Sequence, residues 1–120
     1  MPNDLTTDVA LTLRAAALAY PGAVEDFPWG DRCYKVKGKI FLFLMEPDGG
    51  LGVSLKLPAS NHIVLMFPFA TPTGYGLGKA GWVSLRFAKG EAVDVQTMLS
   101  WLDESYRAIA PKKLVAQLGG

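Results

Sequence analysis

PGAVEDFPWGDRCYKVKGKIFLFLM, from Pro21 to Met45, is the stretch of sequence that decides the fold. Pro21-Gly22 ends a helix, because proline disfavours helical geometry in the residue before it and glycine tolerates a positive φ. An acidic and aromatic corner follows, and we expect Phe27 and Trp29 in it to fill one end of the core. The remainder alternates as a β-hairpin with its turn at Gly38.

The two strands of this hairpin are predicted at Arg32–Lys37 and Lys39–Met45. A two-residue turn sets which side chains share a face of the hairpin. One face then carries Tyr34, Val36, Phe41 and Phe43, and the opposite face carries Lys35 and Lys37. The second strand is apolar on both sides, which predicts a central position in the sheet.

Working outward, apolar residues at three- and four-residue steps predict a helix over residues 5–20, and clean alternation predicts a strand over 51–57. The other expected elements are a short helix within 58–67, a loop from 68 to 81, a strand over 82–87, a long helix capped by Asp94, and a short helical piece over 112–118. This order predicts an α+β domain: an antiparallel β-sheet with N-terminal and C-terminal helices packed on one face.

Composition limits the functional classes. The chain has 120 residues, a formal charge of +1, 50% hydrophobic residues and one cysteine, Cys33. Residues 1–120 therefore form a single domain that needs no disulfide, and one cysteine with one histidine cannot build a typical structural zinc site. No basic leader precedes an apolar segment, and the apolar runs are too short to cross a bilayer, so we expect a cytoplasmic protein with no membrane association.

Several segments resemble the MmcQ/YjbR family from about Leu13 to Leu114. They are LRAAALAYPGAVEDFPWGD, YKVKGKIFLFL, LGVSLKL, GYGLGKAGWVSLRF and DESYRAIAPKKL. The most specific are the PG-x-x-E-D-F-P-x-G corner at 21–30 and the SY-x-x-x-x-x-K pattern at 105–112. The resemblance implies a frataxin (CyaY)-like α+β fold in a small bacterial protein. It also implies DNA binding, with hairpins acting as wings. This chain departs from the family in the loop before Trp82, where many members carry histidine and asparagine.

The outward residues of the predicted sheet are the main candidate binding surface. Lys35, Lys37, Lys56 and Arg86 share a face with Ser54, Ser84 and Trp82. Basic side chains with an interleaved aromatic suit phosphate contacts and base stacking. Lysines on a solvated sheet face also serve solubility and discourage edge pairing. The leading hypothesis is a non-enzymatic binding module for DNA, with weak and salt-dependent affinity. The alternative is a protein-interaction or chaperone-like adaptor that uses the same face and Trp82.

Gly76-Leu-Gly78-Lys-Ala-Gly81 matches the string G-x-G-x-x-G. The dinucleotide motif requires a strand before it and a helix after it, whereas a proline-rich loop precedes this segment and a strand follows. Two interpretations remain: a flexible loop entering a strand, or an anion site formed by the Gly74–Gly81 backbone and Lys79.

No set of residues forms a convincing catalytic site, and no cofactor is expected. His62 is interpreted as a surface or capping residue, and Cys33 as a small buried residue. Glu25, Asp26 and Asp31 form an acidic cluster that suits either a hard cation or ion pairs with nearby basic side chains. We favour ion pairing, and predict neither catalytic nor metal-binding residues.

Overall fold

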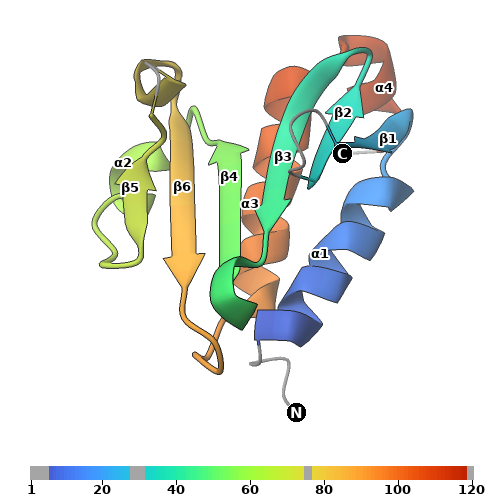
Figure 1. Ribbon diagram of the computed structural model, residues 1–120. Helices are drawn as coiled ribbons and strands as arrows, with labels where there is room; N and C mark the ends of the chain where they lie inside the picture. The colour runs from blue at the N-terminus through green and yellow to red at the C-terminus, as the bar shows by residue number, and fades with distance from the viewer. Residues whose placement is uncertain (1–5, 28–31, 75–76, 119–120) are drawn as a thin grey trace.

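The computed structural model describes residues 6–27, 32–74 and 77–118. Its centre is a six-stranded sheet in the order β1-β2-β3-β4-β6-β5, with every neighbouring pair antiparallel. The strands are β1 (Ala23–Asp26), β2 (Arg32–Val36), β3 (Lys39–Met45), β4 (Leu51–Lys56), β5 (Ala70–Pro72) and β6 (Trp82–Phe87). The helices α1 (Thr6–Ala19) and α3 (Val95–Ile109) cover one face of it (Figure 1). The predicted α+β class is confirmed.

Four short helical segments complete the described part of the chain. They are η1 (Pro47–Gly49), α2 (Asn61–Val64), η2 (Leu77–Ala80) and α4 (Lys112–Ala116). The two long helices follow their predicted patterns: Val9, Leu13 and Ala17 of α1 are buried, and so are Met98 and Leu102 of α3. The Asp94 carboxylate accepts a hydrogen bond from the Thr97 N–H, which caps α3 as predicted.

Aromatic packing ties the end of α1 to α3. The Tyr20 and Tyr106 rings stack with centroids 4.4 Å apart, and the Phe41 ring meets Tyr106 edge-on at 5.2 Å. The Tyr106 hydroxyl donates a 2.6 Å hydrogen bond to the Pro21 carbonyl oxygen. Tyr106, the tyrosine of the SY motif, therefore has a structural role, because it fixes the chain where it leaves α1.

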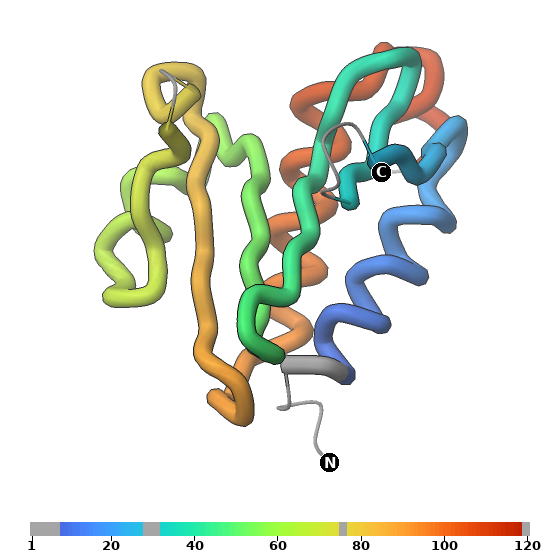
Figure 2. Tube along the Cα trace, viewed as in Figure 1, coloured from blue at the N-terminus to red at the C-terminus, as the bar shows by residue number. Residues whose placement is uncertain are grey.

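The ladder between β3 and β4 is short. It joins Phe43–Met45 to Gly52–Ser54, and beyond it the strands separate toward the end of the domain that carries the β2–β3 turn (Figure 2). The Ser105 hydroxyl lies behind this opening, where it donates to the Phe41 carbonyl and accepts from the Lys56 N–H. Ser105, the serine of the SY motif, thus satisfies with its side chain two backbone groups that strand pairing leaves open.

Two edge strands were missed by the sequence analysis. The acidic corner begins with β1, which pairs with β2, and the predicted loop over 68–81 contains β5, which pairs with β6. Neither strand alternates between apolar and polar residues. Proline occupies the last position of β5, where an edge strand tolerates the loss of an N–H donor.

The predicted face assignment of the hairpin was wrong in part. The β2–β3 register shifts between Tyr34 and Lys35, which leaves Phe41 unpaired as a β-bulge. The bulge places the Phe41 side chain toward the helices and Phe43 on the opposite face, so the two do not share a face. Lys37 is not on the sheet face either, because it lies in the β2–β3 turn with a φ of 52°.

Phe27 was expected to fill one end of the core, and it does not. Its side chain is 54% exposed, because it follows the last residue of the edge strand β1 rather than the end of a helix. Trp29 and Asp31, which the sequence analysis also interpreted, lie outside the described residues. Within the described part of the chain, no helix has the length and apolar character needed to span a membrane.

Candidate functional site

The sheet face opposite the helices is defined by cross-strand rows of side chains, because paired residues point to the same side. One row consists of Phe43, Ser54, Ser84 and Thr71, and the next consists of Met45, Gly52 and Arg86. Lys56 lies opposite Trp82 at the other end of the β4–β6 ladder. Lys56, Trp82 and Arg86 therefore share this outer face, as predicted.

Trp82 is on the outer face but is not available for stacking. It is only 7% exposed, and its ring centroid lies 6.0 Å from that of Phe43. Phe43 is on β3 and Trp82 on β6, so this contact passes over β4. The prediction of an exposed aromatic platform is corrected: Trp82 covers the sheet where β3 and β4 separate.

The serines of the outer face are also engaged. The Ser84 hydroxyl lies 2.9 Å from both the Ser54 hydroxyl and the Thr73 hydroxyl, forming a chain of hydrogen bonds across β4, β6 and the residue after β5. Ser54 is only 6% exposed, although alternation predicted a solvated position. These hydroxyl groups bind one another and link neighbouring strands of the sheet.

Lys35 forms an ion pair with a residue of the neighbouring strand. Its ammonium lies 2.7 Å from the Asp26 carboxylate across the β1–β2 pair. The hydrogen bond to Lys35 lowers the pKa of Asp26, and the same bond raises the pKa of Lys35. The ion-pairing interpretation of Asp26 is confirmed, and Lys35 contributes little free positive charge to the outer face.

Lys56 and Arg86 are the remaining predicted cations of that face. Neither side chain forms a hydrogen bond or ion pair with another residue in the described segments. They are far apart, since Arg86 lies opposite Gly52 and Lys56 is four positions further along β4, roughly 13 Å away. The sheet face therefore does not gather its predicted basic residues into one patch.

A different surface does collect lysines. The β2–β3 turn, the end of β4, η2 and α4 all lie at the same end of the domain, the upper end in Figure 1. The antiparallel order requires this for the strands, because β2 and β4 end where β3 and β6 begin. We call this surface the lysine-rich end, and its residues are Lys37, Lys39, Lys56, Lys79, Lys112 and Lys113.

The lysine-rich end is exposed, and few acidic side chains offset its positive charge. All its lysines are exposed except the partly buried Lys56, and none forms an ion pair with a described residue. The nearest acids of α3 are already bound. Glu104 accepts hydrogen bonds from the N–H groups of Ala59 and Ser60, and Asp103 pairs with Arg107 at 2.7 Å.

Acidic residues gather at the opposite end, which contains the start of α1, the β3–β4 connection and the β6–α3 connection. They are Asp8, Glu46, Asp48, Glu91 and Asp94. The formal charge of +1 thus hides a separation of charge along the strand direction. Sequence reasoning missed it because the lysines come from four segments that only the sheet topology brings to one end.

The predicted anion loop is held by packing. A Cβ on Gly78 would lie 2.9 Å from the Pro72 side chain, and the Gly81 carbonyl accepts a 2.9 Å hydrogen bond from the Leu57 N–H. The close approach of Pro72 explains the glycine at position 78, and a φ of 91° explains the glycine at position 81, both without a ligand. Lys79 is exposed on η2 and belongs to the lysine-rich end.

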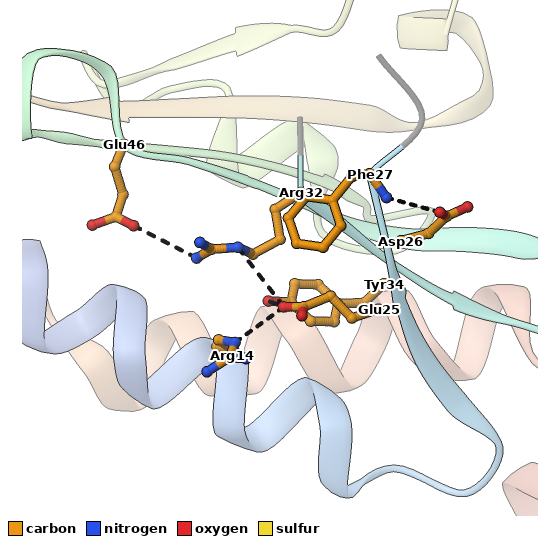
Figure 3. A network of polar contacts seen from close by, with 7 residues as sticks. All are labelled: Arg14, Glu25, Asp26, Phe27, Arg32, Tyr34 and Glu46. Atoms are coloured by element: carbon orange, nitrogen blue, oxygen red, sulfur yellow. Dashed lines mark hydrogen bonds and ion pairs between the residues drawn. The ribbon is translucent and has the colours of Figure 1, made fainter. Parts of the chain in front are cut away.

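Glu25 is the centre of a polar network between α1 and the sheet (Figure 3). Its Oε2 atom lies 3.0 Å from Arg14 Nε, 2.7 Å from the Tyr34 hydroxyl and 3.7 Å from Arg32 Nε. Arg32 also pairs with Glu46 at 3.6 Å. The hydrogen bonds from Arg14 and Tyr34 lower the pKa of Glu25, so this carboxylate is committed to ion pairing.

No group of three or more histidine, cysteine or carboxylate side chains that could hold a metal ion occurs among the described residues. Cys33 is fully buried within β2, and burial raises the pKa of its thiol. His62 is exposed on α2, as expected for a surface residue. Asp31, the third member of the predicted acidic cluster, lies outside the described part.

Comparison with known proteins places this arrangement in context. A crystal structure of the Deinococcus radiodurans protein DR2400, described with the family domain DUF419, superposes with a TM-score of 0.68. The two share 23% sequence identity over 99% of this chain and 91% of the other, which establishes similarity of fold. A search of curated proteins finds no significant match. The family model named YjbR matches residues 18–108, and the chain therefore belongs to the YjbR family.

Proposed function

We propose that this protein is a non-enzymatic binding module whose lysine-rich end contacts the phosphate backbone of DNA. The observation that supports the proposal is the gathering of exposed, unpaired lysines at one end and of carboxylates at the other. Such a separation orients the domain toward a polyanion even when the net charge is near zero. The chemistry is backbone contact, because lysine ammonium groups bind phosphates without reading sequence.

The projecting elements suit this role. The β2–β3 turn presents Lys37 with Lys39 beside it, and η2 presents Lys79. The α4 helix lies against the base of the hairpin: Leu114 and Val36 both approach Gly22, at 3.3 Å and 3.6 Å from the position of an added Cβ. This contact brings Lys112 and Lys113 close to the turn.

The test is a salt series with a labelled random-sequence DNA duplex, followed by fluorescence anisotropy. We expect weak binding, on the order of 10⁻⁴–10⁻⁶ M at physiological salt. Each phosphate contact contributes about −0.9 to the slope of log K against log salt. The combined variant Lys37→Gln, Lys39→Gln, Lys79→Gln should reduce the magnitude of that slope by about 2.7.

The control is Lys89→Gln, which removes one positive charge from the opposite end, in the β6–α3 connection. It should leave DNA binding unchanged. The proposal is wrong if the wild-type protein shows no salt-sensitive binding at about 50 mM salt. It is also wrong if Lys89→Gln weakens binding as much as the triple variant.

A protein-interaction adaptor is a second candidate, and one observation favours it. Ile63, Met66 and Phe67, in and just after α2, are 66%, 83% and 43% exposed. Contiguous exposed apolar side chains are a feature of protein interfaces. The burial of Trp82 removes the side chain on which an adaptor using the outer sheet face depends. The DNA titration separates the candidates, because the adaptor requires no salt-dependent affinity for DNA.

A further inference from the structure

A cavity of about 440 Å³ opens on the outer sheet face, near the acidic end. Its walls include Phe27, Arg32, Met45, Glu46, Gly52 and Arg86, which come from the ends of β1, β3 and β6 and the starts of β2 and β4. The volume lies within the range of ordinary small-molecule sites. The lysine-rich end contributes none of these residues, so the cavity is independent of the proposed DNA contact.

A glycine lies in the cross-strand row that lines the cavity. Met45, Gly52 and Arg86 form one cross-strand row, and its middle position is glycine. A Cβ at Gly52 would meet the Met45 side chain at 3.5 Å, an ordinary contact distance. The fold therefore tolerates alanine at this position, where the added methyl group would pack against the side chains of Met45 and Pro47.

The two arginines that line the cavity differ in their partners. Arg32 lies between two carboxylates, 3.6 Å from Glu46 and 3.7 Å from Glu25, while its buried Nε has no hydrogen-bond partner. Arg86 is exposed, and its side chain forms no hydrogen bond or ion pair with the described residues. Arg86 is thus the cation of this cavity that lacks a counter-charge.

Apart from Glu46, the rest of the wall is apolar. Phe27 is 54% exposed although it borders the cavity, and Met45 is partly buried beside it. The exposed ring of Phe27 and the unpaired guanidinium of Arg86 line the same cavity, and together they suit a ligand with a flat apolar body and one anionic group. A single negative charge matches Arg86, whereas a phosphate monoester, with about −1.5 to −2 charges, would bring excess charge toward Glu46.

We propose that this cavity binds a small organic carboxylate, with the carboxylate on Arg86 and the apolar body against Phe27 and Met45. The probe is phenylacetate, titrated into ¹⁵N-labelled protein and followed by amide chemical shifts. We expect saturable shifts at Gly52, Met45 and Arg86. The affinity of the neutral analogue 2-phenylacetamide should be lower by about tenfold or by more than that, because the amide cannot form the charge-assisted hydrogen bonds.

Two variants test the assignment against a matched control. Arg86→Gln should weaken phenylacetate binding about tenfold, and Gly52→Ala should weaken it by narrowing the cavity with one added methyl group, without unfolding the domain. Lys56→Gln removes another unpaired cation from the same face but outside the cavity, and should leave phenylacetate affinity unchanged. Equal binding of the acid and the amide, wild-type affinity in Arg86→Gln, or no saturable shift up to about 20 mM would overturn the proposal. Tighter binding of phenyl phosphate than of phenylacetate would overturn the choice of a monoanion.

Discussion

The hydroxyl of Ser105 on α3 donates a 2.6 Å hydrogen bond to the backbone carbonyl oxygen of Phe41 on β3. Its oxygen also accepts a 2.9 Å hydrogen bond from the backbone N–H of Lys56 on β4. The β3–β4 ladder does not extend to these positions. A helix side chain therefore satisfies two backbone groups that strand pairing leaves open, and the SY motif of the family has a structural explanation in this chain.

Ser105→Ala should destabilise the domain because it removes both hydrogen bonds at once. Leaving a buried backbone group unpaired costs about 1–3 kcal/mol, and Phe41 is fully buried. Urea unfolding followed by circular dichroism measures the loss. Ser100→Ala, at an exposed position of the same helix, is the control. If the two variants unfold at the same urea concentration, the hydroxyl of Ser105 has no such role.

Trp82→Ala should cost about 3–5 kcal/mol, as expected for removal of a nearly buried tryptophan. The loss arises because the ring covers the sheet beside Phe43 and is only 7% exposed. Arg86→Ala provides a comparison on the same strand and face with an exposed side chain. Measured stabilities that are equal for the two variants would mean that Trp82 is free for ligand contact, as the sequence first suggested.

The elements with strong periodicity were predictable from the sequence. The α1 and α3 helices and the strands β2, β3, β4 and β6 follow apolar patterns over five or more residues, so burial of one face determines them. The edge strands β1 and β5 have four and three residues and no alternation. Their formation depends on a neighbouring strand that offers hydrogen-bond partners, which a local pattern does not contain.

The candidate surfaces were harder to predict, for two physical reasons. Alternation assigns a residue to a sheet face but not its exposure, and Trp82 is buried on the outer face by a side chain two strands away. Ion pairing depends on register, so the pairing of Lys35 with Asp26 was visible only once β1 was known to be a strand. The charge separation between the two ends depends on topology in the same way.

Stability should fall at alkaline pH because of one buried and one partly buried tyrosine. Burial and the hydrogen bond to Glu25 raise the pKa of Tyr34 well above its usual value, and burial with a hydrogen bond to Asp103 does the same for Tyr20. A raised pKa in the folded state contributes stability that is complete below the unfolded value, about pH 10, and is lost as pH rises toward the folded value. The fully buried Tyr34 should lower the unfolding free energy by up to about 1.4 kcal/mol per pH unit above pH 10, and the partly buried Tyr20 should lower it by less because solvent screens it.

Urea unfolding between about pH 8 and pH 11 measures this slope, and absorbance at about 295 nm reports tyrosine ionisation. Tyr34→Phe should make the decline above pH 10 shallower, whatever it does to stability at neutral pH, because one ionising group has been removed. A decline of the same steepness in Tyr34→Phe and in the wild-type protein would show that Tyr34 ionises equally in both states.

The last prediction compares two lysines that are two residues apart. Lys35 is held 2.7 Å from Asp26, whereas Lys37 stands in the turn without an ion pair to any described residue. If DNA binds at the lysine-rich end, Lys37→Gln should reduce the magnitude of the salt slope by about 0.9. Lys35→Gln should leave the slope unchanged, because its charge is already offset by Asp26. Asp26→Asn would release Lys35, and we expect no more than one added contact from it. Equal losses from Lys35→Gln and Lys37→Gln would instead locate the DNA on the outer sheet face.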